Sequence, residues 1–246
     1  MAVSSPLGSR QTVAALLTLT AVTGLVDAVS YLRLGRVFVA NMTGNVVFLG
    51  FSVDPRAGLS AAASVVAIAG FLLGALAGGR AAHTLATAGP ARWLASAFTG
   101  EALILGVAAV LTGTGVLPFA GTGMAGGGSY ATIAALAMAL GVQNSTVRHL
   151  GAPDLTTTVL TLTLTGLTAD SALAGGPGAK PDRRLGSVAA MLAGAGAGAG
   201  LLQWWSPAAV IAVATVLVAA VATAFLTTVP AVLKPPHRAP RPALQA

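Results

Sequence analysis

The sequence predicts an all-α, polytopic membrane protein with six transmembrane helices and two short re-entrant or broken helices. Three observations indicate this fold. The chain is 55% hydrophobic and only 8% charged, whereas soluble domains carry about 25% charged residues. Several segments run for about 20 residues without a charge, which is enough to cross a hydrocarbon core of about 30 Å. The 31 glycines indicate closely packed helices, because small residues let membrane helices approach one another.

The uncharged segments predict the elements in chain order. Six are long enough to cross the membrane, at residues 11–32, 58–79, 93–116, 129–147, 186–205 and 207–229. Two shorter apolar segments, 37–52 and 155–169, have about 15 residues each, and a span needs about 17 or more. They could be re-entrant half-helices or short, steep spans. The first span is too long for the apolar region of a cleaved signal peptide. The basic, Pro-rich tail 231–246 is expected to be disordered.

The basic residues favour six crossings over eight. If the two short segments re-enter, and both termini are cytoplasmic, ten of the 13 Lys and Arg residues face the cytoplasm. If both segments cross, only eight do. Loops on the cytoplasmic side carry an excess of Lys and Arg, so we expect a multi-pass membrane protein with both termini in the cytoplasm. Three spans per half then give an inverted 3+3 repeat, 11–119 against 129–229, within one membrane domain.

Two polar interruptions occupy equivalent places in these halves. The first, GLVDAVSYLRLGRVFVANMTGNVVFLG, begins at Gly24, and the second, GVQNSTVRHLGAPDLTTTVLTLTLTGL, begins at Gly141. Gly24-x-x-Asp27 aligns with Gly141-x-x-Asn144, although chance matching in apolar sequence is the alternative. Breaks in membrane helices are tolerated only inside protein or beside water. The pair therefore predicts a duplicated fold built around a polar site.

Two carboxylates lie within predicted spans. Asp27 lies roughly 7 Å inside the end of the first span, and Glu101 lies about 12 Å below Trp93, at 1.5 Å per residue. Ionisable groups at such depth typically mark ion or proton pathways. Either side chain could bind a proton or a cation, and either could instead hold helices together.

The NMTGN segment contributes Asn41, Thr43, Gly44 and Asn45 to the predicted site. The side chains of the Asn and Thr residues offer oxygens, and Gly44 permits the positive φ of a backbone break. Unwound backbone at such a place can coordinate a cation, or direct a half-helix N-terminus at an anion. A polar turn buried between spans is the alternative.

In the second half, Gln143, Asn144 and Thr157 complete the predicted solute- or ion-binding set. Gln143 and Asn144 align with Val26 and Asp27. Threonines in membrane helices often bond only to their own helix carbonyls, so the Thr-rich segment is the weaker part of the prediction.

Other function classes receive no support. With 0 cysteines there is no thiol chemistry, and no metal-ligand spacing, nucleophile set or phosphate loop occurs. We expect neither an enzyme nor a cofactor or metal. The net charge of +7 reflects membrane orientation, and no nucleic-acid partner is expected. The expected partners are the lipid bilayer, a small solute or ion, and a second copy of the chain through Gly/Ala-rich helix faces.

Residues 12–228 resemble the YoaK-type family of bacterial membrane proteins (domain of unknown function 1275). GLVDAVSYL and VFVANMTGNVVFLG carry the resemblance, supported by ALGVQNSTVRHLG. It implies a six-span inner-membrane protein without an assigned activity. Where the family has Thr-Gly-Thr, this chain has Thr161-Leu162-Thr163, so the second short helix is expected to be more regular than the first.

These observations favour a transporter-like or channel-like protein for a small solute or ion, with its site near the midplane between the repeats. The alternative is a non-transporting membrane scaffold or partner subunit whose buried polar residues are structural.

Overall fold

The computed structural model describes residues 5–85, 89–117, 127–151, 160–176 and 181–227, and these form helices without any strand. In chain order the helices are α1 (Ser9–Arg33), α2 (Met42–Phe51), η1 (Pro55–Ala57), α3 (Ala61–Leu85), α4 (Pro90–Gly113), α5 (Gly127–Leu150), α6 (Leu160–Ala169), η3 (Ala172–Ala174), α7 (Pro181–Leu201) and α8 (Pro207–Leu226). The predicted all-α fold is confirmed. The predicted tail 231–246 lies outside the described residues.

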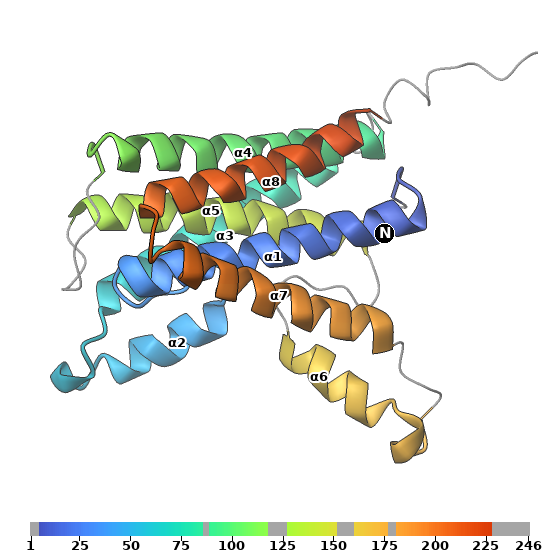
Figure 1. The fold of residues 1–246 in the computed structure, drawn as a ribbon, viewed down its shortest axis with the longest axis horizontal. Coiled ribbons are helices and arrows are strands. Elements are labelled where there is room, and N and C mark those ends of the chain that lie inside the picture. The colour runs from blue at the N-terminus through green and yellow to red at the C-terminus, as the bar shows by residue number, and fades with distance from the viewer. Residues whose placement is uncertain (1–4, 86–88, 118–126, 152–159, 177–180, 228–246) are drawn as a thin grey trace, which may run out of the picture.

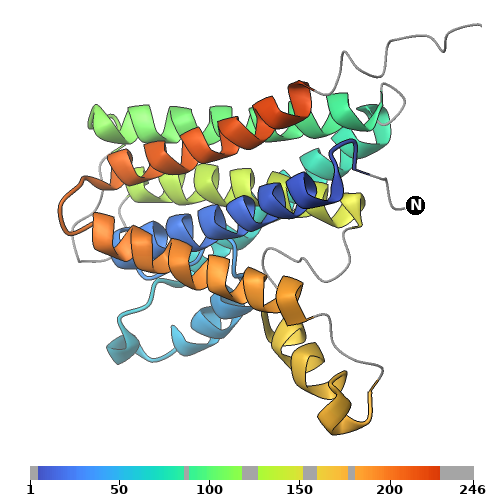
Figure 2. The ribbon, with the colours of Figure 1, turned by 45° about the vertical axis from the view of Figure 1, so that its right-hand side comes forward.

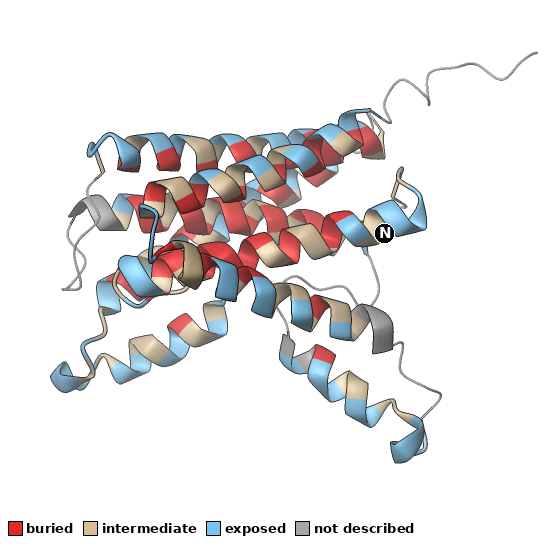
Figure 3. Cartoon of the chain, in the orientation of Figure 1, coloured by how far each residue is buried: buried red, intermediate tan, exposed pale blue. Residues whose placement is uncertain are grey.

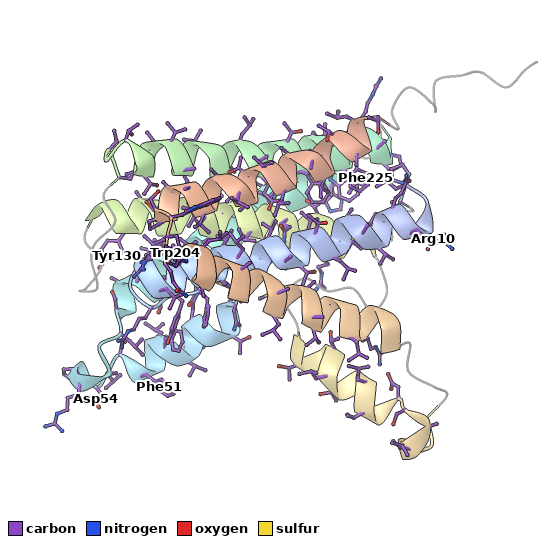
Figure 4. All side chains as sticks on the ribbon, in the orientation of Figure 1. Arg10, Phe51, Asp54, Tyr130, Trp204 and Phe225 are labelled. Atoms are coloured by element: carbon purple, nitrogen blue, oxygen red, sulfur yellow. The ribbon has the colours of Figure 1, made fainter. Side chains whose placement is uncertain are left out.

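Six long helices form one bundle, and their directions alternate. In Figure 1, α1, α4 and α7 run from right to left, whereas α3, α5 and α8 run from left to right, and Figure 2 agrees. The start of α1 and the end of α8 therefore lie at the same end of the bundle, where Arg10 and Phe225 are labelled in Figure 4. The core lies between these helices, and most residues of α2 and α6 are exposed or half-buried (Figure 3).

Four of the described helices are both long and apolar enough to cross a membrane, namely α1, α3, α4 and α8. The predicted spans at α5 and α7 form helices of 24 and 21 residues, but they are not among those four. Their mean hydropathy is lowered by polar residues such as Gln143 and Asn144 in α5, and by the alternating glycines of α7. Gln143 of α5 and two of the α7 glycines, Gly194 and Gly198, are buried against neighbouring helices.

Glycines bring the helices together in two pairs, α1 with α7 and α3 with α5. A Cβ on Gly24 would strike the backbone of Met191 and Ala195 in α7. A Cβ on Gly141 would strike the backbone of Phe71 and Ala75 in α3. The two contacts correspond residue for residue, because Gly141 follows Gly24 by 117 residues and both α7 positions follow their α3 counterparts by 120.

Two more contacts keep the same register. Gly194 of α7 faces the Ala21 carbonyl of α1, and Gly74 of α3 faces the Met138 carbonyl of α5. Gly198 faces Leu25 in the same way as Gly78 faces Val142. Such contacts leave no room for a side chain, so the spacing of the glycines fixes the axial register of each helix pair.

The short helices α2 and α6 both begin near the middle of the bundle and diverge toward opposite ends (Figure 1). α2 packs on α3, and α6 packs on α7. α6 runs unbroken through Thr161–Thr163, as the substitution of Leu162 for glycine predicted.

One prediction about the first interruption is wrong. Gly44 does not break the backbone, because it lies in the first turn of α2 and has no positive φ. The break lies upstream, at residues 34–41, where Gly35 and Arg36 have φ of 101° and 58°. Gly44 is required for a different reason, since a Cβ there would lie 2.8 Å from the Phe38 ring.

Candidate functional site

Asp27 organises the irregular segment between α1 and α2. Its carboxylate Oδ1 accepts hydrogen bonds from the backbone N–H groups of Val39 (2.8 Å) and Ala40 (3.0 Å). Both of these residues are buried, so their N–H groups cannot bond to solvent and need a protein partner. Asp27 itself is only 5% exposed. The predicted intramembrane carboxylate is therefore buried and already bonded to the break beside it.

Asn45 supports the same segment from α2. Its Nδ2 donates to the Phe38 carbonyl (2.6 Å), and its Oδ1 accepts from the Phe38 N–H (3.0 Å). The Phe38 ring stacks on those of Tyr31 and Phe48, with centroid distances of 5.1 and 5.5 Å, and these two rings also contact each other at 6.1 Å. Side chains from both flanking helices thus bond to the backbone of Phe38, Val39 and Ala40 within the break.

Asn41 and Thr43 do not point into the bundle. Both are exposed, and Asn41 caps α2 by accepting a hydrogen bond from the Gly44 N–H at 3.3 Å. Ser, Thr, Asp and Asn are the usual residues at this capping position. Of the four predicted NMTGN residues, only Asn45 lies in the interior.

Gln143 joins the two halves at the centre of the bundle. Its Nε2 donates to the Thr23 hydroxyl of α1 at 2.8 Å and lies 3.4 Å from the Leu19 carbonyl. Thr23 precedes Asp27 by four residues and so lies one turn away on the same face of α1. Gln143 of α5 therefore contacts the face of α1 that carries Asp27, at a point about 6 Å from Asp27 along the helix axis. The two residues were predicted from different halves of the chain.

Gln143 is buried, and its Oε1 has no hydrogen-bond partner among the described residues. Its neighbour Asn144 donates to the Leu140 carbonyl of its own helix at 2.8 Å and has a further interaction. Thr157, the last predicted site residue, lies outside the described residues.

Glu101 lies apart from the Asp27 segment, in the middle of α4. It is fully buried, and both carboxylate oxygens lack a hydrogen-bond partner in the described part of the chain. Its neighbours on the same face of α4, Phe98 and Leu105, are apolar and buried. Phe98 stacks on Phe225 of α8 at 5.7 Å. Buried polar atoms without partners are rare, so this carboxyl group requires a specific explanation.

Three apolar cavities have described residues as their lining, and none of these three is lined by a predicted site residue. The largest, about 790 Å³, lies between α4 and α8 and is lined by residues such as Leu103, Val107 and Thr223. Within the described ranges, no cluster of three or more His, Cys, Asp or Glu residues could hold a metal ion.

Two participants were not predicted from the sequence. Thr23 binds Gln143, and its position one turn before Asp27 was the signal that could have identified it. Arg36 adopts a positive φ of 58°, which is uncommon for a residue with a side chain. Its place after Gly35, in the Leu-Gly loop, was the corresponding signal for the true site of the break.

Comparisons with known proteins agree on one family. A family model described as "Protein of unknown function (DUF1275)" matches residues 15–224. The chain is 34% identical over 166 residues to the UPF0700 transmembrane protein YoaK of Bacillus subtilis (strain 168), an alignment that covers 65% of this chain and 67% of that protein. No solved structure matches the chain.

Proposed function

Because the chain belongs to the DUF1275 family, as its resemblance predicted, we propose that it is a transporter-like or channel-like membrane protein for a small solute or ion. Its site lies near the midplane, between two inverted repeats. The observation that carries this proposal is the break at residues 34–41, whose buried Val39 and Ala40 are held by Asp27 beside the Gln143 contact that joins the halves. Secondary transporters commonly place their sites at discontinuous helices between inverted repeats.

The glycine contacts support an inverted repeat. The register that brings Gly24 onto α7 also brings Gly141 onto α3. The equivalent helices run in opposite directions, α1 against α5, α3 against α7 and α4 against α8 (Figure 1). A two-fold axis perpendicular to the helices produces this relation, and such an axis lies in the membrane plane when the helices cross it.

We further propose six crossings, which add α5 and α7 to the four helices that meet the length and hydropathy criteria. At 1.5 Å per residue, helices of 24 and 21 residues reach about 36 and 32 Å, enough for a hydrocarbon core of about 30 Å. Gln143 of α5 and the glycines Gly194 and Gly198 of α7 face α1.

The ends of the helices support the proposed orientation. One end of the bundle carries basic residues at the start of α1, α4 and α7 and near the end of α3 and α5, namely Arg10, Arg92, Arg184, Arg80 and Arg148. The opposite end carries Arg33, Arg36 and Arg56. By the positive-inside rule the first end, with the start of α1 and the end of α8, is cytoplasmic.

Reconstitution tests the proposal directly. Purified protein is first screened by thermal shift against alkali cations, inorganic anions, amino acids and sugars, because a bound ligand raises stability by RT ln(1 + [L]/Kd). Flux of each hit is then measured in proteoliposomes. We expect Asp27→Asn to reduce flux, because it removes the charge but keeps an oxygen to accept the two N–H bonds. Asp54→Asn is the matched control, since Asp54 is an exposed carboxylate in the loop after α2.

A non-transporting scaffold or partner subunit is the second candidate, and a specific observation favours it. The carboxylate of Asp27 bonds to backbone groups of the segment between α1 and α2. Asn45 bonds to the Phe38 backbone of the same segment and to the Met42 sulfur of its own helix, as expected for structural residues. On this alternative, Asp27→Asn lowers the melting temperature, and the wild-type protein moves none of the screened solutes faster than protein-free liposomes do.

A further inference from the structure

Glu101 is the one glutamate in the sequence, and its surroundings define what it can bind. On a helix, successive residues are rotated by about 100°. Gly106, which packs on Thr215, marks the side of α4 that faces α8. Ile104 and Ala108, which line a cavity with Ala135, mark the side that faces α5. Glu101 lies between these two sides and therefore points into the interior where α5 and α8 meet α1.

Glu101 and Gln143 lie at nearly the same depth. α4 and α5 are antiparallel (Figure 1), and the ring contact between Trp93 and His149, at 6.4 Å, sets their relative level. Glu101 follows Trp93 by eight residues in α4, and Gln143 precedes His149 by six residues in α5. Because the helices are antiparallel, both residues lie on the same side of the ring contact. At 1.5 Å per residue the two side chains start about 12 and 9 Å from the contact. They therefore differ by about 3 Å in depth.

At this depth the interior presents three oxygens without partners among the described residues, two on Glu101 and one on Gln143. All three are acceptors when Glu101 is ionised, so the site lacks a donor. The amide nitrogen of Gln143 cannot supply one, because its two N–H groups donate to the Thr23 hydroxyl and the Leu19 carbonyl. An ionised carboxylate without a partner in such a place is very costly, and such groups become neutral instead.

Two occupants could supply the missing positive charge, a metal cation or a proton. A hard cation such as Ca²⁺ takes six to eight oxygen ligands, and this site offers three. A proton requires only one carboxylate oxygen, and the resulting hydroxyl can donate to the free Oε1 of Gln143, directly or through a buried water. The oxygen count therefore favours the proton.

We propose that Glu101 is the proton-binding carboxyl group of this protein, neutral at physiological pH and hydrogen-bonded toward Gln143. The proposal rests on the proposed function in one respect, since the proton would be the coupling ion of the transported solute. Asp27 has a different role, because two backbone N–H groups already stabilise its carboxylate. The described part of α8 has no ionisable residue. The other helices around Glu101 carry Arg10, Asp27, Tyr31 and Arg33 in α1, Arg80 and His83 in α3, Arg92 in α4 itself, and Tyr130, Arg148 and His149 in α5.

The single glutamate makes a direct test possible in the wild-type protein. Cell-free synthesis with glutamate labelled with ¹³C at the side-chain carboxyl places the label at Glu101 alone. Solid-state NMR of the labelled protein in liposomes then distinguishes a protonated carboxyl from a carboxylate by chemical shift. We expect the protonated shift at neutral pH. The carboxylate shift at neutral pH would overturn the proposal.

A pair of variants tests the hydrogen bond to Gln143. Gln143→Leu removes the acceptor, and we expect the labelled Glu101 signal to move. Ser145→Ala is the control on the same helix, because Ser145 faces Gly78 of α3, and it should leave the signal in place. An unmoved signal in Gln143→Leu, with the protein folded, would show that Gln143 is not the partner.

Flux measurements separate this proposal from the proposed function. For a transported solute, we expect Glu101→Gln to lose the dependence of flux on a pH gradient, whereas Asp54→Asn keeps it. If the wild type transports nothing but Glu101 is protonated, the proposed function fails and the proton site stands. If Glu101→Gln transports with unchanged dependence on the pH gradient, the coupling role of Glu101 is wrong while transport stands.

Discussion

The glycine contact between α1 and α7 gives the sharpest prediction for stability. Gly194 and Gly196 are neighbours in the same small-residue run, but only Gly194 touches another helix. A Cβ on Gly194 would lie far inside van der Waals distance of the Ala21 carbonyl, whereas a Cβ on Gly196 would meet nothing within 4 Å. Gly194→Ala therefore adds a methyl group to a closed helix contact, whereas Gly196→Ala adds one to an open surface two residues away.

The magnitude follows from the geometry. Ordinary van der Waals contact begins at 3.4 Å, so α1 and α7 must separate by more than about 1 Å to admit the Gly194→Ala methyl group. A gap of 0.5–1 Å costs roughly a quarter to a half of each dispersion contact along the interface. Overpacking of this kind costs about 1–3 kcal/mol. Gly196→Ala should be neutral, or stabilise by up to about 1 kcal/mol, because alanine is the better helix former.

The assay is unfolding in mixed micelles by titration with a denaturing detergent, followed by circular dichroism. We expect Gly194→Ala to lower the free energy of unfolding and Gly196→Ala to leave it unchanged or raise it. Gly74→Ala, at the equivalent contact of α3 with α5, should cost a similar amount. Equal effects at Gly194 and Gly196 would refute the packing assignment, and a neutral Gly74→Ala would refute the equivalence of the two pairs.

Three further predictions concern polar groups. Asp27→Ala should lower stability by about 2–6 kcal/mol, because two buried N–H groups lose their partner at about 1–3 kcal/mol each. Asp27→Asn should recover most of this loss in the same titration. Asn45→Ala should speed limited proteolysis between α1 and α2, since both backbone bonds to Phe38 are lost, and an unchanged cleavage rate would contradict this. Arg184→Gln should change stability by less than about 1 kcal/mol. The 2.8 Å ion pair between Arg184 and Asp170 is partly exposed, and such pairs contribute little to stability. A larger loss of stability, or a loss insensitive to salt, would show that the pair is effectively buried.

The helices could be predicted from the sequence because a membrane requires long uncharged segments. The predicted spans and short segments coincide with α1 to α8 to within several residues. The position of the first break could not be predicted in the same way. Gly44 was the obvious residue for a break, but its missing side chain makes room for the Phe38 ring, a contact between residues that only the folded segment brings together.

The polar residues also divide into properties that the sequence predicts and properties that it does not. The sequence by itself determined that Asp27, Glu101 and Gln143 lie within apolar helices, because hydropathy and depth follow from residue order alone. Only the tertiary structure decided their partners. Asp27 bonds the backbone of the break, Gln143 reaches Thr23 across the bundle, and Glu101 has no partner among the described residues. Hydrogen bonds extend over about 3 Å, so they depend on how the glycine contacts set the register between helices, and that register is not encoded in any one segment.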